Sequence, residues 1–304
     1  MRTTQYNCFG GQVMMVAFIV FCFLASLAGP AFGADLPEVK ASGVLRHIGV
    51  PYANFVTGGG DGLDVDLMKL FAKRLGVQYV YVETSWPKVI EDISGKTFHR
   101  VGESIEITGS TKALGDIAAS GVTILPWREK IVDFSTPTFP NQVWLAARSD
   151  SRLQPITPSG DMLKDVEMVK SRLKDITVLG ISGTCIDPKL YGIPEVGAIA
   201  RNFDGKLNEM VPAVINGDAE TALLDVPDIL ISMEKWPGRF KIIGPISEMQ
   251  NMGCAFSKES PKLREAFNSF FKECLDNGVY AGLLNKYYPA IMQMYPDFFP
   301  QANH

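Results

Sequence analysis

The chain lacks the residues and spacings on which metal centres and common catalytic motifs depend. Its three histidines, His47, His99 and His304, are not spaced from one another as metal ligands are. Neither a phosphate-binding Gly-x-x-x-x-Gly-Lys loop nor a Gly-x-Ser-x-Gly elbow occurs in the 304 residues. Basic residues form no run and the formal net charge is −4, which argues against nucleic acid as a partner. We therefore expect no metal and no cofactor.

Cysteine is scarce, and two of the five cysteines lie in an N-terminal segment that we expect to be removed. The stretch from Val13 to Ala28 is almost entirely apolar, and small residues at positions 31 and 33 fit cleavage after Gly33. Residues 1–33 are thus predicted to be a secretory signal peptide, and the protein to be periplasmic. A retained membrane anchor is the alternative, but the apolar run is shorter than the ~20 residues that span a bilayer.

Three cysteines would then remain, Cys185, Cys254 and Cys274. Three cysteines allow at most one disulfide. If one forms, Cys254 with Cys274 is the favoured pair, because both lie in the C-terminal part. Three buried thiols are the simpler interpretation, and we prefer it, since unpaired cysteine behaves as a small buried hydrophobic residue.

Strand and helix patterns alternate along the chain, which predicts an α/β fold with sheets covered by helices. Two similar units are visible, and the C-terminal segment is too short to form a third. We therefore expect it to return to the first unit. Lobe 1 is predicted as 36–146 plus 251–304 and lobe 2 as 147–250, with hinge crossings near Val143–Ala147 and Ser247–Gly253.

The stretch from Gly115 to Phe139 carries the clearest signal for a binding site. A short apolar strand runs into small residues, and Arg128 follows in the first turn of a short predicted helix. A guanidinium offers a planar pair of donors that matches a carboxylate. The residues expected to bind a small anion here are Ser120, Gly121, Thr123 and Arg128.

Two further candidate positions follow strands of the second unit, where ligands of open α/β sheets bind. Thr184 and Cys185 come after a predicted strand, at a turn whose N–H groups could attract an anion. Asp225 ends another strand, just before Pro227. A plain strand-to-helix turn and a helix cap are the alternatives for these two places.

Three aromatic residues follow strands of the first unit: Tyr52, Phe55 and Trp86. They could line the pocket for a ligand side chain, or they could belong to the core. Trp127 lies beside Arg128 and is a weaker candidate, because we expect it to point away.

From about Gly43 to Tyr288 the chain resembles the family 3 extracellular solute-binding proteins. These are the type II periplasmic binding proteins that feed amino-acid ABC importers. The resemblance implies a two-lobed α/β fold, with two mixed, mostly parallel sheets joined by a two-strand hinge. It also implies a small-molecule ligand, a permease partner in the inner membrane and a monomer.

The same resemblance assigns roles to particular residues. Arg128 would hold the α-carboxylate of an amino acid or similar small carboxylate, and Asp225 would bind the α-amino group. The family often has a second threonine where this chain has Cys185, so only the backbone N–H of Cys185 carries over. Arg128, Thr123 and the amides near Gly121 would then make more of the contacts to the ligand carboxylate than in a typical relative.

Two segments depart from the family pattern. Lys96 to Leu114 is an insertion with alternating residues, for which we expect a surface hairpin that could rim the cleft or contact a partner. The C-terminal tail from Tyr287 to Pro300 is rich in aromatic residues, and we expect it to pack on lobe 1.

Two other functions stay open. The cyclohexadienyl dehydratases share this fold, so a periplasmic enzyme is one alternative, although no positioned acid is evident from the sequence. A binding or signalling subunit that works without a transporter is the other, and only the insertion at Lys96–Leu114 favours it.

Overall fold

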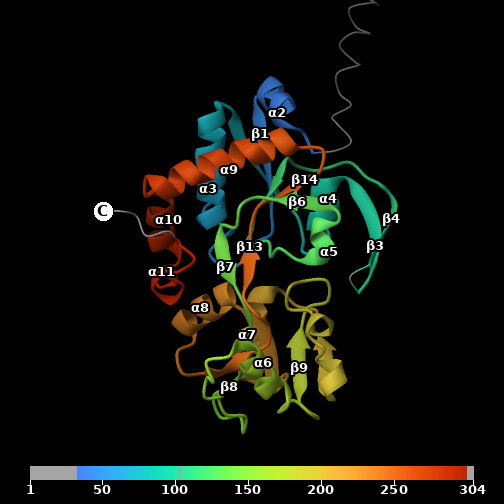
Figure 1. Ribbon diagram of the computed structural model, residues 1–304, viewed down its shortest axis with the longest axis vertical. Helices are drawn as coiled ribbons and strands as arrows, with labels where there is room; N and C mark the ends of the chain where they lie inside the picture. Colours follow the sequence, from blue (N-terminus) through green and yellow to red (C-terminus); the bar gives the residue numbers. More distant parts are fainter. Residues whose placement is uncertain (1–32, 103, 300–304) are drawn as a thin grey trace, which may run out of the picture.

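Two five-stranded sheets, one above the other in Figure 1, divide the protein into two lobes. The structure is a computed structural model, and it describes residues 33–102 and 104–299. The expected signal peptide, with Cys8 and Cys22, therefore lies outside the described residues except for Gly33. Within the described part, no helix has the length and apolar character needed to cross a bilayer.

The sheet of lobe 1 has the strand order β2-β1-β5-β14-β6. Its strands are β1 (Val44–Gly49), β2 (Gln78–Glu83), β5 (Ile117–Ala118), β6 (Val132–Phe134) and β14 (Ala255–Ser257). Around it lie α2 (Leu36–Ser42), α3 (Leu63–Leu75), α4 (Val89–Ser94), α5 (Pro126–Glu129), α9 (Pro261–Asp276) and α10 (Val279–Tyr287), followed by the short α11 (Ile291–Met294). Because β14 comes from the far end of the chain, the C-terminal segment does return to the first sheet.

The sheet of lobe 2 has the order β10-β9-β11-β8-β12. Its strands are β8 (Val143–Arg148), β9 (Thr177–Gly180), β10 (Ile199–Asn202), β11 (Thr221–Asp225) and β12 (Phe240–Pro245). Its helices are α6 (Met162–Lys170), α7 (Met210–Asn216) and α8 (Val226–Lys235), with 3₁₀ turns at Pro188–Tyr191, Pro194–Val196 and Leu207–Glu209. The α/β class with mixed sheets is confirmed, but each sheet has two parallel and two antiparallel pairings rather than mostly parallel ones.

Two antiparallel strands, β7 (Phe139–Asn141) and β13 (Gln250–Met252), run between the lobes. The second predicted crossing, 247–253, contains β13. The first, 143–147, is placed differently, because these residues already pair inside the second sheet as β8. The apolar run there is a buried strand, so the crossing lies a few residues earlier, and the expected boundary at 146 falls within β8.

Helix α3 shows why the local sequence folds as it does. Leu63, Leu67 and Phe71 recur along one face and are fully buried against the sheet. Gly76 ends the helix at φ +73°, a left-handed conformation that glycine adopts without steric cost.

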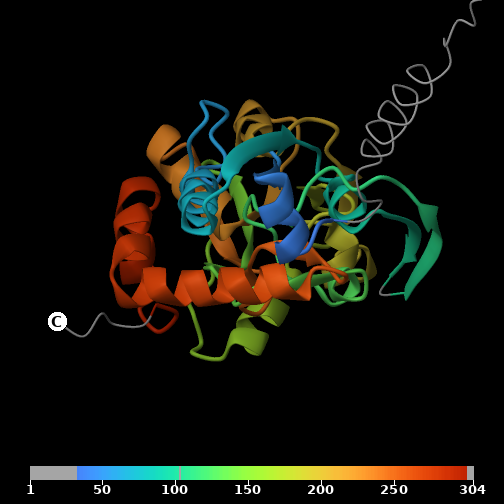
Figure 2. The ribbon, with the colours of Figure 1, turned by 90° about the horizontal axis from the view of Figure 1, so that it is seen from above.

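The insertion forms the predicted hairpin, with β3 (Lys96–Val101) antiparallel to β4 (Ser104–Ser110). Figures 1 and 2 show it standing out from lobe 1 on the side away from α10. In Figure 1 the hairpin also descends toward the upper loops of lobe 2.

The aromatic tail packs on lobe 1, as expected, and supports the segment that carries Tyr52. The Tyr288 hydroxyl accepts a hydrogen bond from the Asn54 N–H at 2.9 Å, and the Tyr287 hydroxyl accepts one from the Gly62 N–H at 3.1 Å. The tail then reaches lobe 2, which the sequence did not predict. Met294 and Tyr295 line an apolar cavity of about 140 Å³ together with residues of β8, α8 and β12.

Candidate functional site

The predicted residues of both lobes meet at the junction between the two sheets. The Tyr52 hydroxyl, from lobe 1, donates a hydrogen bond to the Asp225 carboxylate, at the end of β11 in lobe 2. Arg128 in α5 and Cys185, in the turn after β9, interact electrostatically. Since these contacts join different lobes, the structure shows a closed arrangement.

Asp225 is a buried carboxylate that accepts a hydrogen bond from each of three neighbouring groups. It is 1% exposed and accepts from the Tyr52 hydroxyl, from the Cys185 thiol at 3.5 Å and from the Asp228 N–H at 3.4 Å. The last bond makes it the N-cap of α8, so the helix-cap interpretation also holds. Burial raises the pKa of Asp225 because the charged form is poorly solvated, and the three hydrogen bonds only partly offset this.

A second buried carboxyl lies beside Asp225. Asp228 is 5% exposed, and one of its oxygens has no partner among the described residues. Burial and then the neighbouring Asp225 charge raise its pKa well above the ordinary value. Because two buried carboxylates so close together repel, we take Asp228 as the one that is protonated.

Arg128 is a buried cation that forms no ion pair with a carboxylate of the described residues. It is 1% exposed, its Nη1 donates to the Thr123 carbonyl at 2.8 Å, and its Nε has no partner among the described residues. Burial lowers the pKa of Arg128 to about 10, and the Arg100 charge acts in the same direction. A guanidinium that is desolvated in this way and pairs with no described carboxylate is suited to bind an anion.

Cys185 lies between the two charged residues. Its thiol interacts with Asp225 and with Thr123, and the Arg128 charge acts on it too. Burial and the Asp225 charge raise the pKa of Cys185, so the side chain remains a neutral thiol. It is therefore a weak hydrogen-bond donor here rather than a nucleophile.

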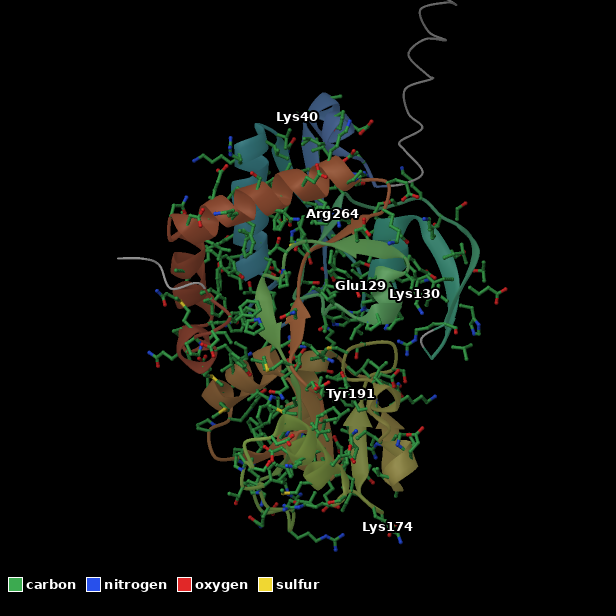
Figure 3. All side chains as sticks on the ribbon, in the orientation of Figure 1. Lys40, Glu129, Lys130, Lys174, Tyr191 and Arg264 are labelled. Carbon is green, nitrogen blue, oxygen red and sulfur yellow. The ribbon has the colours of Figure 1, made fainter. Side chains whose placement is uncertain are left out.

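The sequence did not single out Asn141 or Tyr191. Asn141, in the crossing strand β7, donates to the Thr123 hydroxyl at 3.2 Å and accepts from the Val226 N–H at 3.3 Å. The Tyr191 hydroxyl donates to the Cys185 carbonyl and accepts from Gln250 at 3.1 Å. Figure 3 labels Tyr191 on lobe 2, below Glu129 at the end of α5 in lobe 1. An asparagine within an apolar segment was a usable signal, whereas Tyr191 offered none.

The hairpin also reaches this site. Arg100 of β3 lies with its guanidinium 4.9 Å from the centre of the Trp127 ring and forms an ion pair with Asp187 of lobe 2 at 3.4 Å. The Arg128 guanidinium lies 5.2 Å from the same ring. Trp127, expected to point away, thus stands beside both arginines.

Several predicted residues already have other partners. The Gly121 N–H donates to the buried Asp64 carboxylate at 2.8 Å, so this amide is not free for a ligand. The Thr184 hydroxyl donates to the Ile181 carbonyl at 2.7 Å within its own turn. The Phe55 ring is fully buried and packs directly on the backbone of Gly121. A Cβ atom at position 121 would lie only 2.5 Å from this ring. Phe55 therefore packs in the interior of lobe 1, and its role in lining a ligand pocket stays a prediction.

Of the remaining two candidates, Trp86 contacts Tyr52, and Ser120 follows β5 within the predicted anion-binding stretch. The Trp86 ring is 5.5 Å from that of Tyr52 in an edge-on arrangement and is partly exposed. Ser120 is fully buried, and its hydroxyl has no described partner. Within the anion-binding stretch, the Ser120 hydroxyl is therefore a hydrogen-bonding group that no described residue uses.

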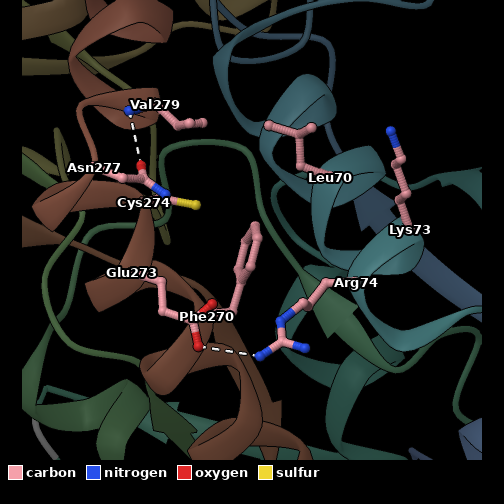
Figure 4. Close-up of a pocket in the computed structure, with 8 residues that line it drawn as sticks. All are labelled: Leu70, Lys73, Arg74, Phe270, Glu273, Cys274, Asn277 and Val279. Atoms are coloured by element: carbon pink, nitrogen blue, oxygen red, sulfur yellow. Dashed lines mark hydrogen bonds and ion pairs between the residues drawn. The ribbon is translucent and has the colours of Figure 1, made fainter.

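No group of three or more metal-ligating side chains occurs within residues 33–102 and 104–299. The described cysteines, Cys185, Cys254 and Cys274, are free and buried. A separate cavity of about 400 Å³ lies between α3 and the α9–α10 region, where Arg74 pairs with Glu273 at 3.1 Å (Figure 4). It contains none of the predicted site residues.

Comparison with known proteins gives a consistent result. The model of the bacterial extracellular solute-binding proteins, family 3, matches residues 49–114 and 109–290. A curated relative, the membrane-bound lytic murein transglycosylase F of Desulfosudis oleivorans, is 24% identical over 231 residues, which are 76% of this chain and 44% of the relative. The chain spans less than half the length of the curated relatives it matches.

Two solved structures share the fold over most of the chain. A P235GK mutant of ArgBP from T. maritima has a TM-score of 0.64 and 25% identity, over 84% of this chain and 99% of its own. The ancestral amino acid-binding protein AncCDT-1, a precursor of cyclohexadienyl dehydratase, has a TM-score of 0.64 and 25% identity, over 83% and 98%. These matches confirm both the resemblance and the two-lobed fold.

Proposed function

Because the chain belongs to the bacterial extracellular solute-binding proteins, family 3, we propose that it closes on an amino acid or a similar small carboxylate held between its lobes. The proposal includes export by the expected signal peptide, residence in the periplasm and delivery of the ligand to an ABC importer. The proposed domain division follows the two sheets, with the boundary moved to about residue 142.

Arg128 carries this proposal. It is a buried guanidinium with no described carboxylate partner, and a carboxylate ligand would supply the missing charge. Asp225 stands on the other lobe, with Cys185 between the two, and could accept an α-ammonium group. Each charge-assisted bond would contribute roughly 1.5–3 kcal/mol in a site that excludes water.

The division of the two charges between lobes would couple binding to closure. A ligand that contacts Arg128 and Asp225 together has more contacts in the closed state, so it shifts the hinge equilibrium toward that state. Binding would require the Tyr52 hydroxyl and the Cys185 thiol to share or release the Asp225 oxygens that they occupy. An ammonium group can replace both, because it has three donors.

The comparisons support an amino acid as the ligand class. AncCDT-1 is named as an amino acid-binding protein, and it matches 83% of this chain at 25% identity. We extend the same class of ligand to this chain because Arg128 and Asp225 place a cation and a carboxylate on opposite lobes.

Calorimetry against a panel of amino acids and small organic acids tests the proposal. We expect at least one ligand to bind to the purified protein, and Arg128→Gln to weaken it strongly. Arg74→Gln is the matched control, because Arg74 lines the separate cavity of Figure 4 and its side chain is 60% exposed. A ligand that binds Arg128→Gln as tightly as the unchanged protein would contradict the carboxylate assignment.

An enzyme on the same fold is the second candidate, and one observation favours it. Asp225 and Asp228 are buried carboxyl groups with raised pKa values, and a buried acid in a cleft can donate a proton. A dehydratase would need such a proton at the leaving hydroxyl group. Prephenate and arogenate are the substrates to assay; turnover that Asp225→Asn abolishes would establish the enzyme, and no turnover above background would remove it.

A further inference from the structure

The β3–β4 hairpin brings a second guanidinium to the anion-binding end of the site. Arg100 and Arg128 both lie near the Trp127 ring, at 4.9 and 5.2 Å from its centre. Phe98 of the same hairpin packs on that ring with centres 5.9 Å apart, which fixes the hairpin against α5. The Arg100 side chain is only 17% exposed, so it is largely buried between the Trp127 ring and Asp187 rather than lying on the surface.

The buried polar atoms left without a partner around Trp127 are all donors. They are Nη1 of Arg100, Nε1 of Trp127 and Nε of Arg128, counted over the described residues. A buried N–H without an acceptor is costly, so a ligand with several acceptor oxygens would gain most at this place. The unpartnered buried oxygens of the described residues are the Ser120 hydroxyl and one oxygen each of Asp64 and Asp228, and none of these three residues has a described contact with the Trp127 ring.

The charges show the same imbalance. Asp187 is the one described carboxylate that pairs with either arginine, and it reaches only Arg100, at 3.4 Å. Asp187 also accepts from the Gly183 N–H at 3.1 Å and the Lys189 N–H at 3.1 Å, so its charge is shared. The two guanidiniums repel, as the effect of Arg100 on the Arg128 pKa indicates. A single carboxylate ligand would offset Arg128 and leave Arg100 with this one long ion pair.

We propose that Arg100 is a specificity-determining residue and that the ligand carries a second acidic group, as an acidic amino acid or a dicarboxylate of similar size does. This inference rests on the proposed function, since it concerns the same cleft. The α-carboxylate binds Arg128, and the second acidic group binds Arg100 beside Trp127. The hairpin insertion gives the chain this preference, because β3 carries both Arg100 and Phe98, which packs on the Trp127 ring.

Acid and amide pairs of the same shape test the proposal by calorimetry: L-glutamate with L-glutamine, L-aspartate with L-asparagine, and succinate with succinamate. The unchanged protein should bind one acid at least about 10-fold more tightly than its amide. Arg100→Gln should remove most of that preference by weakening the acid alone. Arg128→Gln should weaken acid and amide together, and Arg74→Gln should change neither.

Asp187→Asn separates this role from a simple tie between the lobes. If Arg100 binds the ligand, loss of the Asp187 charge keeps or increases the preference for the acid. If Arg100 serves only to hold Asp187, then Arg100→Gln and Asp187→Asn weaken acid and amide by the same factor, and the proposal is overturned. Tight binding of a neutral or basic amino acid, with no acid preferred, also overturns it but leaves the proposed function intact. No binding of any amino acid or organic acid contradicts the proposed function itself.

Discussion

The two halves of the cleft differ in how far their polar groups are satisfied. On lobe 1, Arg128 and Ser120 are buried and each keeps an unpartnered polar atom among the described residues. On lobe 2, Asp225 accepts three hydrogen bonds and the Thr184 hydroxyl is used within its own turn, and the one unpartnered buried atom among the described residues is an oxygen of Asp228. The lobe 1 half is therefore ready for a ligand anion, whereas the lobe 2 half has to exchange partners.

This difference suggests an order of events. A carboxylate can bind Arg128 without displacing any described group from its Nε. The ammonium group must then compete with Tyr52 and Cys185 for Asp225. We expect the anion contact to supply most of the affinity and the ammonium contact to select among ligands.

The largest effect should come from Arg128→Gln. The change removes the cation that we expect to bind the α-carboxylate, and loss of one partner of a buried ion pair typically costs about 3–5 kcal/mol. We expect the affinity for the ligand to fall by about 100-fold or more. Calorimetry measures it, and an unchanged circular dichroism spectrum controls for folding. A loss of affinity no larger than that of the control Arg74→Gln would contradict a role for Arg128 in binding, and a loss smaller than that of Asp225→Asn would reverse the ranking of the two halves.

Asp64→Asn tests the carboxylate that occupies the Gly121 amide. Burial raises the pKa of Asp64 from 3.8 to about 7, so the native state binds the proton more strongly than the unfolded chain. This contribution is fully present below pH ~4 and is lost as the pH rises through ~7. Between pH 5 and 8 the protein should lose about 3 kcal/mol of unfolding free energy from this group. Urea unfolding should show a smaller loss in Asp64→Asn; equal pH dependence in both proteins would sink this account.

Asp225→Asn should have an intermediate effect that depends on the ligand. The raised pKa of Asp225 means that Asp225 begins to take up a proton at a higher pH than an ordinary aspartate. An ammonium group favours the ionised form, so in the pH range where Asp225 is partly protonated binding releases protons and strengthens as the pH rises. We expect Asp225→Asn to weaken amine-bearing ligands by about 10-fold and to abolish the proton release. Titrations in buffers of different ionisation enthalpy measure the release. Equal weakening of a ligand and its deaminated analogue would mean that Asp225 does not bind the ammonium group.

The smallest effects should come from the two threonines, which form a matched pair. Thr123→Val on lobe 1 removes a buried hydroxyl that accepts from Asn141 and contacts Cys185, and should weaken binding by about 5-fold. Thr184→Val on lobe 2 removes a hydroxyl that is engaged in its own turn, so the affinity should stay within about 2-fold. A larger loss of affinity in Thr184→Val than in Thr123→Val would show that the hydroxyl that binds the ligand comes from lobe 2.

Much of the fold could be predicted from the sequence because the patterns are local. The apolar stripe of α3, the glycines that end helices and the alternation in the insertion each determine their own element. The return of β14 to the first sheet could be expected because the C-terminal segment is too short to form a core alone. The position of the crossing strands could not, since Val143 to Arg148 reads equally well as a hinge or as a buried strand.

The site was predictable only where a residue follows a strand. Arg128 and Asp225 were found in this way, but their roles remain proposals. Asn141 and Arg100 reach the site from β7 and from the hairpin, and their positions depend on how distant segments pack. The contact between Gly121 and Asp64 depends on how α3 packs beside the turn after β5, which no local pattern encodes.

A structure with the ligand found by calorimetry tests the central claim most directly. The account predicts that a carboxylate of the ligand lies within hydrogen-bond distance of the Arg128 guanidinium and that its ammonium group contacts Asp225. The Tyr52 hydroxyl should then no longer be the closest donor to the Asp225 carboxylate. A ligand that leaves the Tyr52–Asp225 bond intact and makes no contact with Arg128 would contradict it.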